Sequence, residues 1–428
     1  MLHTSLPGFR DFYPAELSVR SHIMHAWREV ARRYGFEEYD GPPLEALELY
    51  TEKSGAEIVR QLYNFEDKGG RAVALRPEMT PTLARMVAAR AGGLRKPIRW
   101  FSMPQLFRYE RTQRGRLREH FQWNVDILGE ADIAADAEVL AVALDGLRAL
   151  GLGPADIVAR CNDRRLLEQL LRGSGVAPGQ LDAVYGVVDK LTREPAERIR
   201  ERLVAETGLD ATVADAVLRV FAHEDLTSIR AAYGADPQVT TELDRLDAYS
   251  ARLRELGFAD YVRFDPAIVR GLAYYTGTVF EIFDRRGELR AICGGGRYDN
   301  LLRNIGAVDL PGVGFGMGDV VLGELLAERG LLPAERPAVD YYLAAVSYAE
   351  RAVMLRVARV LRARGASVLY ALRSVGVGKQ FKEADARGAA QVLVFGPEEL
   401  SRGVVVARTM ASGAERPVPL AEWLGDEA

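Results

Sequence analysis

Apolar positions along the first third of the chain follow first a helical spacing and then a strand spacing. Ile23, Trp27 and Val30 recur at helical intervals within residues 14–34, and Gly35 follows as a stop signal. Strands joined by short turns, with helices to one side, favour a mixed or antiparallel sheet over a doubly wound one. Shorter runs predict strands at 36–44, 62–66, 71–75, 98–103, 106–110 and 122–128, with a helix at 80–90.

The pattern changes twice further along the chain. Residues 160–256 are dense in Leu, Ala, Arg and Glu at helical spacing, which predicts a helical insertion. Beyond a Pro-containing linker at 330–337, strands and helices alternate, which predicts a small α/β domain with a largely parallel sheet. Between these regions the sequence predicts strands at 262–264, 279–283 and 289–293, then a final amphipathic helix at 318–329.

Composition narrows the class of protein. A chain of 428 residues is too long for one ordinary core, so we expect two or three domains. The net charge of -4 excludes a protein that coats nucleic acid through bulk charge. Two cysteines and five histidines predict neither a disulfide framework nor a metal site held by side chains. The N-terminus does not have the pattern of a signal peptide, and no apolar run is long enough to cross a membrane, so we expect a cytoplasmic protein.

A charged turn follows the strand predicted at 71–75. Arg76 and Glu78 come where the next helix begins, and Thr80 adds a hydroxyl group. Glu78 suits an ammonium group, and Thr80 suits a further hydrogen bond. The alternative is a carboxylate that only offsets the positive end of the helix dipole.

Arginines gather between two predicted strands in residues 107–129, with Glu110 and Gln122 at the strand ends. Repeated guanidinium groups suit bidentate contacts with phosphates, and the middle of this loop could reach the end of a nucleic acid. The alternative is an ordinary basic hairpin on a solvated face. The arginines are Arg108, Arg111, Arg114, Arg116 and Arg118.

Two later segments combine glycine, arginine and tyrosine. Arg270 precedes a glycine and then the paired tyrosines 274–275, a pattern that suits a phosphate beside an aromatic ring. Residues 294–299, GGGRYD, predict a glycine-rich loop from which Arg297 and Tyr298 project. A tight turn is the alternative, and the absence of a following Lys-Ser or Lys-Thr excludes a P-loop.

Taken together, these segments resemble the histidyl-tRNA synthetases, a family of class II aminoacyl-tRNA synthetases, over nearly the whole chain. The segments VALRPE, VRGLAYYTGTVFE and AICGGGRYD resemble parts specific to that family, and their spelling is closest to its plant-type branch. YGFEEYDGPPLE is similar to motif 1, which forms the family's dimer interface. FRYERTQRGR through FQWNVD is similar to motif 2, and GVGFGMGD to motif 3.

The resemblance implies an α+β fold with a mixed or antiparallel catalytic sheet, a helical insertion and a C-terminal α/β anticodon-binding domain. It implies ATP-dependent ligation of L-histidine to tRNA(His) through a histidyl-adenylate, with Mg²⁺ accompanying ATP, in a homodimer. The implied bounds are 1–158 and 257–330 for the two parts of the catalytic domain, 159–256 for the insertion and 337–428 for the anticodon-binding domain.

The resemblance also implies a role for each matching residue. Catalysis is assigned to Arg270 and Arg108, on the α-phosphate. Histidine binding is assigned to Glu78, Thr80 and Gln122 at the α-amino group, and to Asp126, Tyr275 and Tyr298 at the imidazole. ATP binding is assigned to Arg108, Glu110, Arg116, His120 and Phe121, with one of the last two stacked on adenine. Contact with tRNA is assigned to Gln113 and Arg114.

Two positions depart from the family pattern. Asp126 stands where many members have a glutamate, so its contact with the imidazole is expected to involve a water molecule. In motif 3, Val321 stands where the Gly-x-Glu-Arg pattern has an arginine that covers adenine and the γ-phosphate. The rival interpretation is a non-catalytic, histidine-binding paralogue that regulates ATP phosphoribosyltransferase. Such regulators typically lose catalytic arginines and the anticodon domain, whereas this chain keeps Arg270 and a C-terminal segment similar to that domain.

Overall fold

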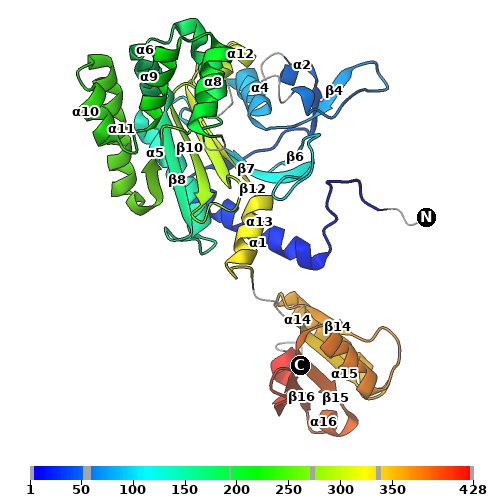
Figure 1. The fold of residues 1–428 in the computed structure, drawn as a ribbon. Helices are drawn as coiled ribbons and strands as arrows, with labels where there is room; N and C mark the ends of the chain where they lie inside the picture. Colours follow the sequence, from blue (N-terminus) through cyan, green and yellow to red (C-terminus); the bar gives the residue numbers. More distant parts are fainter. Residues whose placement is uncertain (1–3, 52–58, 192–193, 270–274, 334–338, 425–428) are drawn as a thin grey trace. The chain divides into compact units, whose positions relative to one another are not determined.

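The computed structural model describes residues 4–51, 59–191, 194–269, 275–333 and 339–424. The chain divides into two compact units, Met1–Leu332 and Pro333–Ala428. Each unit has its own sheet and its own core (Figure 1). Within the described residues, no helix is both long enough and apolar enough to span a membrane.

The first unit is built on a mixed sheet of nine strands among the described residues. Neighbouring strands are antiparallel except for the outermost pairs, β1 with β5 and β8 with β9. The predicted mixed or antiparallel sheet is therefore confirmed. In spatial order the strands are β1 (Glu37–Glu38), β5 (Ile98–Ser102), β7 (Glu119–Leu128), β12 (Gly312–Gly318), β11 (Cys293–Arg297), β10 (Thr278–Asp284), β8 (Ile157–Asp163) and β9 (Val262–Phe264), with β6 (Gln105–Phe107) paired to β7.

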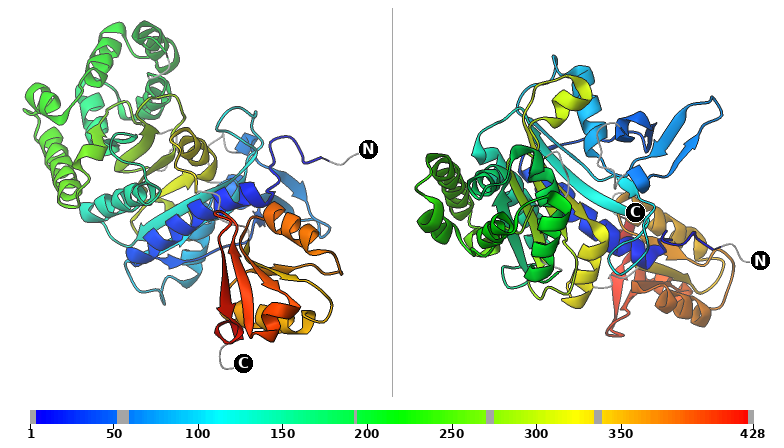
Figure 2. Two further views of the ribbon diagram at one scale, coloured as in Figure 1. Left: turned by 90° about the horizontal axis from the view of Figure 1, so that it is seen from below. Right: turned by 45° about the horizontal axis from the view of Figure 1, so that its top comes forward.

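One face of this sheet is covered by three helices, α1 (Pro14–Arg33), α5 (Ile133–Arg148) and α13 (Asp319–Glu328). Figure 2 shows α1 running across the sheet. Its apolar stripe is buried at Ile23, Trp27 and Val30, as the spacing predicts. The ring of Trp27 stacks on Trp123 of β7, with 5.8 Å between the ring centroids. These contacts hold β7 in place from the face of the sheet that α1 covers.

The opposite face is only partly covered. Helices α4 (Thr80–Arg90) and α12 (Leu301–Gly306) pack on each other and on the β7 and β10 side chains. A small antiparallel sheet stands beside α4 and includes β2 (Leu44–Ala46), β4 (Ala72–Leu75) and β3 (Asn64–Glu66), with α2 (Glu48–Thr51) packed against it. The uncovered part of this face holds the candidate site.

The segment predicted as a helical insertion begins inside β8 and continues as helices beside that edge of the sheet (Figure 1, green). Its longest helix, α11 (Pro237–Glu255), packs on α5 and on α6 (Arg164–Gly173), so the insertion belongs to the first unit. The helices are α6 (Arg164–Gly173), η1 (Pro178–Gln180), α7 (Leu181–Val188), α8 (Ala196–Thr207), α9 (Ala211–Phe221), α10 (Leu226–Tyr233) and α11 (Pro237–Glu255), with η2 (Ala259–Tyr261) leading into β9.

The second unit has a five-stranded sheet in the order β14-β13-β15-β16-β17. The first three strands are parallel and the last two antiparallel, so the largely parallel sheet we predicted is wrong at one edge. Segment 396–403 is too short for a crossover that would keep the next strand parallel. The elements are β13 (Val339–Ala345), α14 (Arg351–Ala363), β14 (Val368–Tyr370), α15 (Val377–Ala386), β15 (Ala389–Phe395), α16 (Pro397–Ser401), β16 (Val404–Thr409), β17 (Glu415–Pro419) and α17 (Leu420–Leu424).

Two strand predictions in the first unit differ from the structure. The single strand expected at 36–44 is two strands in different sheets, β1 and β2. Gly41, Pro42 and Pro43 separate them, because proline cannot donate to a ladder of hydrogen bonds. The strand expected at 289–293 begins only at Cys293.

Candidate active site

Strand β7 separates the core from the candidate site, because its side chains alternate between the two faces of the sheet. Trp123 and Val125 are buried in the core behind the sheet. Gln122, Asn124 and Asp126 line a cavity on the opposite face. The alternation along this strand therefore decides which of its residues can meet a ligand.

The first cavity has a volume of about 500 Å³. It contains all six side chains that the family resemblance assigns to histidine binding. Polar groups dominate its walls, which suits a small zwitterionic ligand. Its lining consists of Glu78, Thr80, Arg108, Gln122, Asn124, Asp126, Tyr275, Gly294, Tyr298, Gly314, Phe315 and Gly316.

Glycines on β12 make room for the polar side chains of β7. A Cβ atom added at Gly316 would lie 2.7 Å from the side-chain amide of Gln122. One added at Gly314 would collide with the carboxylate of Asp126. Larger residues at these two positions would displace both side chains from the cavity wall.

Asp126 and Tyr298 form the most buried polar pair of the first cavity. Asp126 is 4% exposed, and the Tyr298 hydroxyl donates a hydrogen bond to its carboxylate. Burial raises the pKa of Asp126 to about 7, although the hydrogen bond from Tyr298 opposes this rise. Once ionised, the carboxylate can accept a hydrogen bond from a ring N–H group of a ligand.

Glu78 lies at the entrance of α4 with its side chain in the cavity wall, and it is 6% exposed. Met79 is the N-cap residue of α4, and the helix has no side-chain cap. Arg76, two residues earlier, has a structural contact instead: its Nη1 atom is 2.8 Å from Asp40 Oδ1. Burial of the Glu78 carboxylate in a cavity favours the ligand interpretation over a simple helix-end charge.

A second cavity of about 900 Å³ adjoins the first. The two share the side chains of Arg108 and Gln122 and the backbone of two glycines. Its lining consists of Arg108, Glu110, Gly115, Arg116, Leu117, His120, Gln122, Glu281, Arg290, Ala291, Ile292, Cys293, Gly294, Gly316, Gly318, Val320 and Val321.

Arg108 stands where the two cavities meet. Its Nε atom donates to the Pro77 carbonyl at 2.9 Å, which orients the guanidinium group. Among the described residues, its side chain makes no other hydrogen bond. The remaining donors can therefore reach an anion held between the two cavities.

The loop after β6 carries the remaining predicted contacts. Arg116 and Glu110, both predicted for ATP, form an ion pair within the second cavity. Gln113 and Arg114, predicted for tRNA, lie at the exposed tip and line neither cavity. Arg114 is paired with Glu324 of α13, its Nε atom 3.3 Å from Oε2. The same helix holds Arg114 a second time, through Glu328.

His120 and Phe121, the two candidates for stacking on adenine, lie on opposite faces of β7. His120 lines the second cavity. Burial lowers its pKa to about 3, helped by the nearby charges of Arg108 and Arg10, so the ring is neutral at pH 7. Phe121 is not in the lining of either cavity. Of the two rings, His120 is therefore the one that lines a cavity.

Phe121 belongs to a cluster behind the sheet. The guanidinium of Arg20 lies 4.3 Å from the centre of its ring, and the ring of Phe12 packs edge-on at 6.0 Å. The backbone N–H of Phe121 donates to Asp319 of α13, whose other carboxylate oxygen pairs with Arg10 at 2.9 Å. Asp319, the last residue of the motif 3 segment, thus ties α13 to β7.

The glycine-rich loop predicted at 294–299 is instead largely strand β11. A Cβ atom at Gly295 would lie 2.5 Å from the Gly314 carbonyl, so glycine permits close packing between β11 and β12. Arg297 does not project from a loop, because it is fully buried. The prediction failed because a run of glycines has no hydrophobic alternation by which a strand is recognised.

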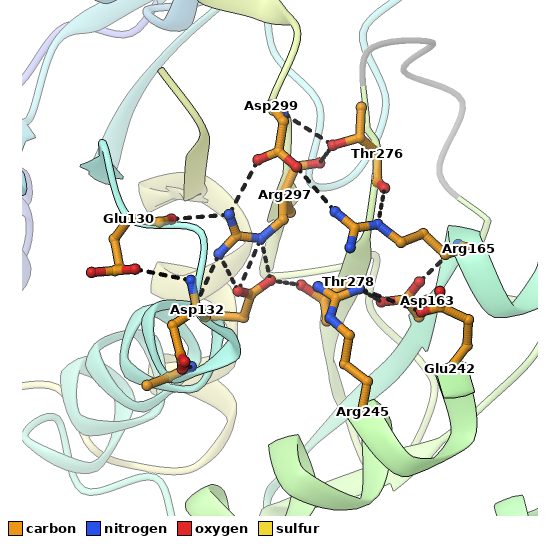
Figure 3. A network of polar contacts seen from close by, with 12 residues as sticks. Glu130, Asp132, Asp163, Arg165, Glu242, Arg245, Thr276, Thr278, Arg297 and Asp299 are labelled. Atoms are coloured by element: carbon orange, nitrogen blue, oxygen red, sulfur yellow. Dashed lines mark hydrogen bonds and ion pairs between the residues drawn. The ribbon is translucent and has the colours of Figure 1, made fainter. Parts of the chain in front are cut away.

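Arg297 is the centre of a network that we call the buried polar cluster (Figure 3). Its Nε atom donates to both carboxylate oxygens of Asp136 at 3.0 Å, and its terminal nitrogens reach Asp299 and backbone carbonyls. Arg165 of α6 and Arg245 of α11 extend the network to the helical insertion. The members are Asp132, Asp136, Asp163, Arg165, Arg245, Thr276, Thr278, Arg297 and Asp299.

Segment 269–281 contains two predicted site residues, Tyr275 and Arg270, and the structure describes only the first. Tyr275 lies in the first cavity and is 7% exposed. Arg270, predicted to contact the α-phosphate, lies outside the described residues. Its role therefore stays a prediction from the sequence.

Three polar residues that no sequence motif had indicated as ligand contacts also line the cavities: Asn124, Glu281 and Arg290. Asn124 could have been found, because it lies between Gln122 and Asp126 on the same face of a strand. Glu281 ends the segment VRGLAYYTGTVFE, which was selected for other residues. Arg290 lies in the segment that the sequence predicted as a strand at 289–293, and no neighbouring residue there indicated a contact with a ligand.

An antiparallel sheet with a cavity suited to a small zwitterion, joined to a larger one lined by arginines, is the arrangement of a class II aminoacyl-tRNA synthetase. Comparisons with known proteins narrow the class. Residues 8–318 match the histidyl-tRNA synthetase family profile, and residues 341–425 match the profile of the anticodon binding domain.

The histidine–tRNA ligase of Opitutus terrae is 44% identical over 97% of this chain and 95% of its own length. The chloroplastic/mitochondrial histidine–tRNA ligase of Arabidopsis thaliana is 38% identical over 97% of this chain and 85% of its own length. The crystal structure of histidyl-tRNA synthetase from Nostoc sp. PCC 7120 has the same fold, with a TM-score of 0.84 over 99% of this chain and 98% of its own at 24% identity. The chain belongs to the histidyl-tRNA synthetase family.

Proposed function

We propose that this chain joins L-histidine to tRNA(His) in two steps, with ATP first activating the amino acid as histidyl-adenylate. The observation that carries the proposal is the meeting of two cavities at Arg108 and Gln122 in a chain of this family. One cavity has the polar groups for an amino acid, and the other has room and cationic groups for a nucleotide.

The amino acid is held by polar contacts at both of its ends. Glu78, Thr80 and Gln122 bind the α-ammonium group, because a buried carboxylate and neighbouring hydrogen-bonding groups suit a cation. Asp126, Tyr275 and Tyr298 bind the imidazole. A ligand without the ring nitrogens would leave these buried polar groups unpaired, so the site rejects apolar analogues strongly.

Activation needs no nucleophile from the protein. A carboxylate oxygen of histidine attacks the α-phosphorus of ATP, forming the new P–O bond as the bond to the bridging oxygen breaks and pyrophosphate leaves. Arg108, and Arg270 from its sequence match, stabilise the negative charge that develops on the α-phosphate. Holding both reactants in adjoining cavities also lowers the entropic part of the barrier.

The nucleotide is bound in the second cavity by Glu110, Arg116 and the neutral ring of His120. Glu110 faces the adenine amino group, Arg116 meets the phosphates, and the His120 ring stacks on adenine. Mg²⁺ accompanies ATP in this proposal, and Glu281 on the cavity wall is a fitting oxygen ligand, since Mg²⁺ is usually bound by one or two carboxylates together with phosphates. The ion neutralises phosphate charge when bound.

In the second step the acyl group passes to a terminal ribose hydroxyl of tRNA, and AMP leaves. Gln113 and Arg114, at the tip of the loop after β6, contact the acceptor end. Residues 341–425, which match the anticodon binding domain, bind the anticodon. We further propose that the chain acts as a homodimer through its motif 1 segment, in the cytoplasm.

The regulatory paralogue of ATP phosphoribosyltransferase is not favoured. The curated relatives matched over nearly the whole chain are named histidine–tRNA ligases, and the match to the anticodon binding domain covers most of the second unit. Arg108, which a regulator would not need, lies in both cavities.

Histidine-dependent exchange of labelled pyrophosphate into ATP tests the first step, and charging of tRNA(His) tests the second. We expect exchange with histidine and none with other amino acids. Arg108→Ala should lower the exchange rate by about 100- to 1000-fold, because it removes donors from the α-phosphate. Arg111→Ala is the matched control, since Arg111 is exposed in the same loop and lines neither cavity. Histidine binding by the wild-type protein without any exchange would refute the proposal.

A further inference from the structure

The second cavity has a valine at the place where the family pattern has an arginine. Val321 lies in the first turn of α13 and contributes apolar surface to the cavity wall. Of the arginines already assigned to ATP, Arg116 also forms an ion pair with Glu110, and Arg108 lies at the junction with the first cavity. A polyphosphate carries several negative charges, so a further cation beside Val321 would stabilise it in the second cavity.

Arg290 lies in the connection between β10 and β11, and its side chain lines this cavity. Two buried neighbours hold the connection in place, Leu289 at 8% and Ile292 at 2% exposure. The N–H of Ile292 donates to the Ile282 carbonyl at 2.8 Å, and its carbonyl accepts from Gly318 N–H at 3.3 Å. The segment just after Arg290 is thus held to β10 and to Gly318, the N-cap residue of α13.

Arg290 and Val321 approach the same point of the cavity wall. A Cβ atom built at Gly115 would lie 3.1 Å from Val321 Cγ2 and 3.8 Å from Arg290 Cδ. The Arg290 side chain is exposed to solvent. Within the part of the chain that the structure describes, it makes no hydrogen bond and no ion pair. Its guanidinium group is therefore available to a ligand at the place where Val321 offers only methyl groups.

We propose that Arg290 binds the β- and γ-phosphates of ATP and so replaces the arginine absent at position 321. The inference rests on the proposed function, because it assigns a nucleotide to the second cavity. A guanidinium group on an otherwise unpaired side chain binds a phosphate through two parallel charge-assisted hydrogen bonds. The side chain enters from the connection before β11 rather than from α13, and reaches the same part of the cavity from another element.

The test compares Arg290→Gln with Arg286→Gln in pyrophosphate exchange. Arg286 is an exposed arginine in the same connection that lines neither cavity, so it controls for net charge. We expect the KM for ATP to rise about 10- to 100-fold in Arg290→Gln, with the KM for histidine changed less than about twofold. Arg286→Gln should keep both values.

Two further measurements separate a phosphate contact from a general disturbance. Adding Val321→Arg to Arg290→Gln should restore most of the ATP affinity, since the arginine then enters from the motif 3 position. The Kd of tripolyphosphate, measured by calorimetry, should rise in Arg290→Gln by a similar factor, whereas the Kd of adenosine should not change.

An unchanged Kd for tripolyphosphate in Arg290→Gln would overturn the inference, whether or not the protein is active. A weaker Kd for adenosine with an unchanged Kd for tripolyphosphate would also overturn it, because Arg290 would then contact the base. If the wild-type protein shows no exchange but Arg290→Gln weakens tripolyphosphate binding, the proposed function fails while the phosphate contact of Arg290 stands.

Discussion

The buried polar cluster and the two cavities lie on the same sheet, but they use arginine in opposite ways. In the cluster, all three guanidinium nitrogens of Arg297 donate to protein oxygens, and the side chain is fully buried. In the cavities, the Arg108 side chain makes one hydrogen bond among the described residues, through Nε. A side chain that the protein satisfies completely holds the fold together, whereas one left with open donors on a cavity wall is available to a ligand.

Breaking the buried polar cluster should give the largest effect on stability. Arg297→Met leaves Asp136 buried without its cation, so we expect a loss of about 3–5 kcal/mol in the free energy of unfolding. Urea unfolding followed by circular dichroism measures it. The matched control is Arg290→Met, an exposed arginine near the start of the same strand, which should change stability by less than about 0.5 kcal/mol. Equal stability of the two variants would contradict the structural role of the cluster.

The two faces of β7 offer a second comparison, with a smaller effect. His120→Ala should weaken ATP binding about tenfold, because it removes a neutral ring of the kind that stacks on a base. Phe121→Ala should leave ATP binding nearly unchanged and instead lower stability by about 1–2 kcal/mol, since its ring packs on Phe12 and Arg20. ATP titration and thermal unfolding of both variants make the comparison. The reverse pattern would place the adenine on the other face of β7.

The smallest expected effect is the pH dependence caused by Asp126. Its pKa is about 7 in the folded protein against about 4 in an unfolded chain, so between these values the folded state binds more protons. The free energy of unfolding therefore decreases as pH rises through this window. We expect a decrease of about 1 kcal/mol between pH 6 and 7 relative to Asp126→Asn, whose side-chain amide does not titrate. Parallel pH dependence in both proteins would show that Asp126 is already ionised at pH 6.

Much of the fold could be predicted because it follows regular spacing. The stripe of Ile23, Trp27 and Val30 predicts α1 to within one residue, since one helix face is buried. The strand β7 could be predicted because every second side chain faces the core. The same alternation places Gln122 and Asp126 on the opposite face of the sheet. The local sequence pattern therefore suffices to predict a helix or strand in which buried side chains recur at regular intervals.

The rest depends on partners distant in sequence. Nothing near Arg297 indicates that Asp136, 161 residues away, neutralises it. Nothing around His120 and Phe121 in the sequence shows which ring lines the second cavity, because that depends on which face of the sheet α1 covers. The position of Arg290 on the cavity wall follows only from the fold, which brings the connection between β10 and β11 next to α13. Sequence predicted the chemical groups of the site, and tertiary packing decided which of them reach the cavities.

The wall shared by the two cavities has a thermodynamic consequence. A ligand in either cavity that orders Arg108 and Gln122 prepares those side chains for the ligand in the other. The factor by which histidine tightens ATP must then equal the factor by which ATP tightens histidine, since both describe one cycle of equilibria. We therefore expect the two cavities to bind their ligands cooperatively, because each ligand orders side chains that the other also contacts.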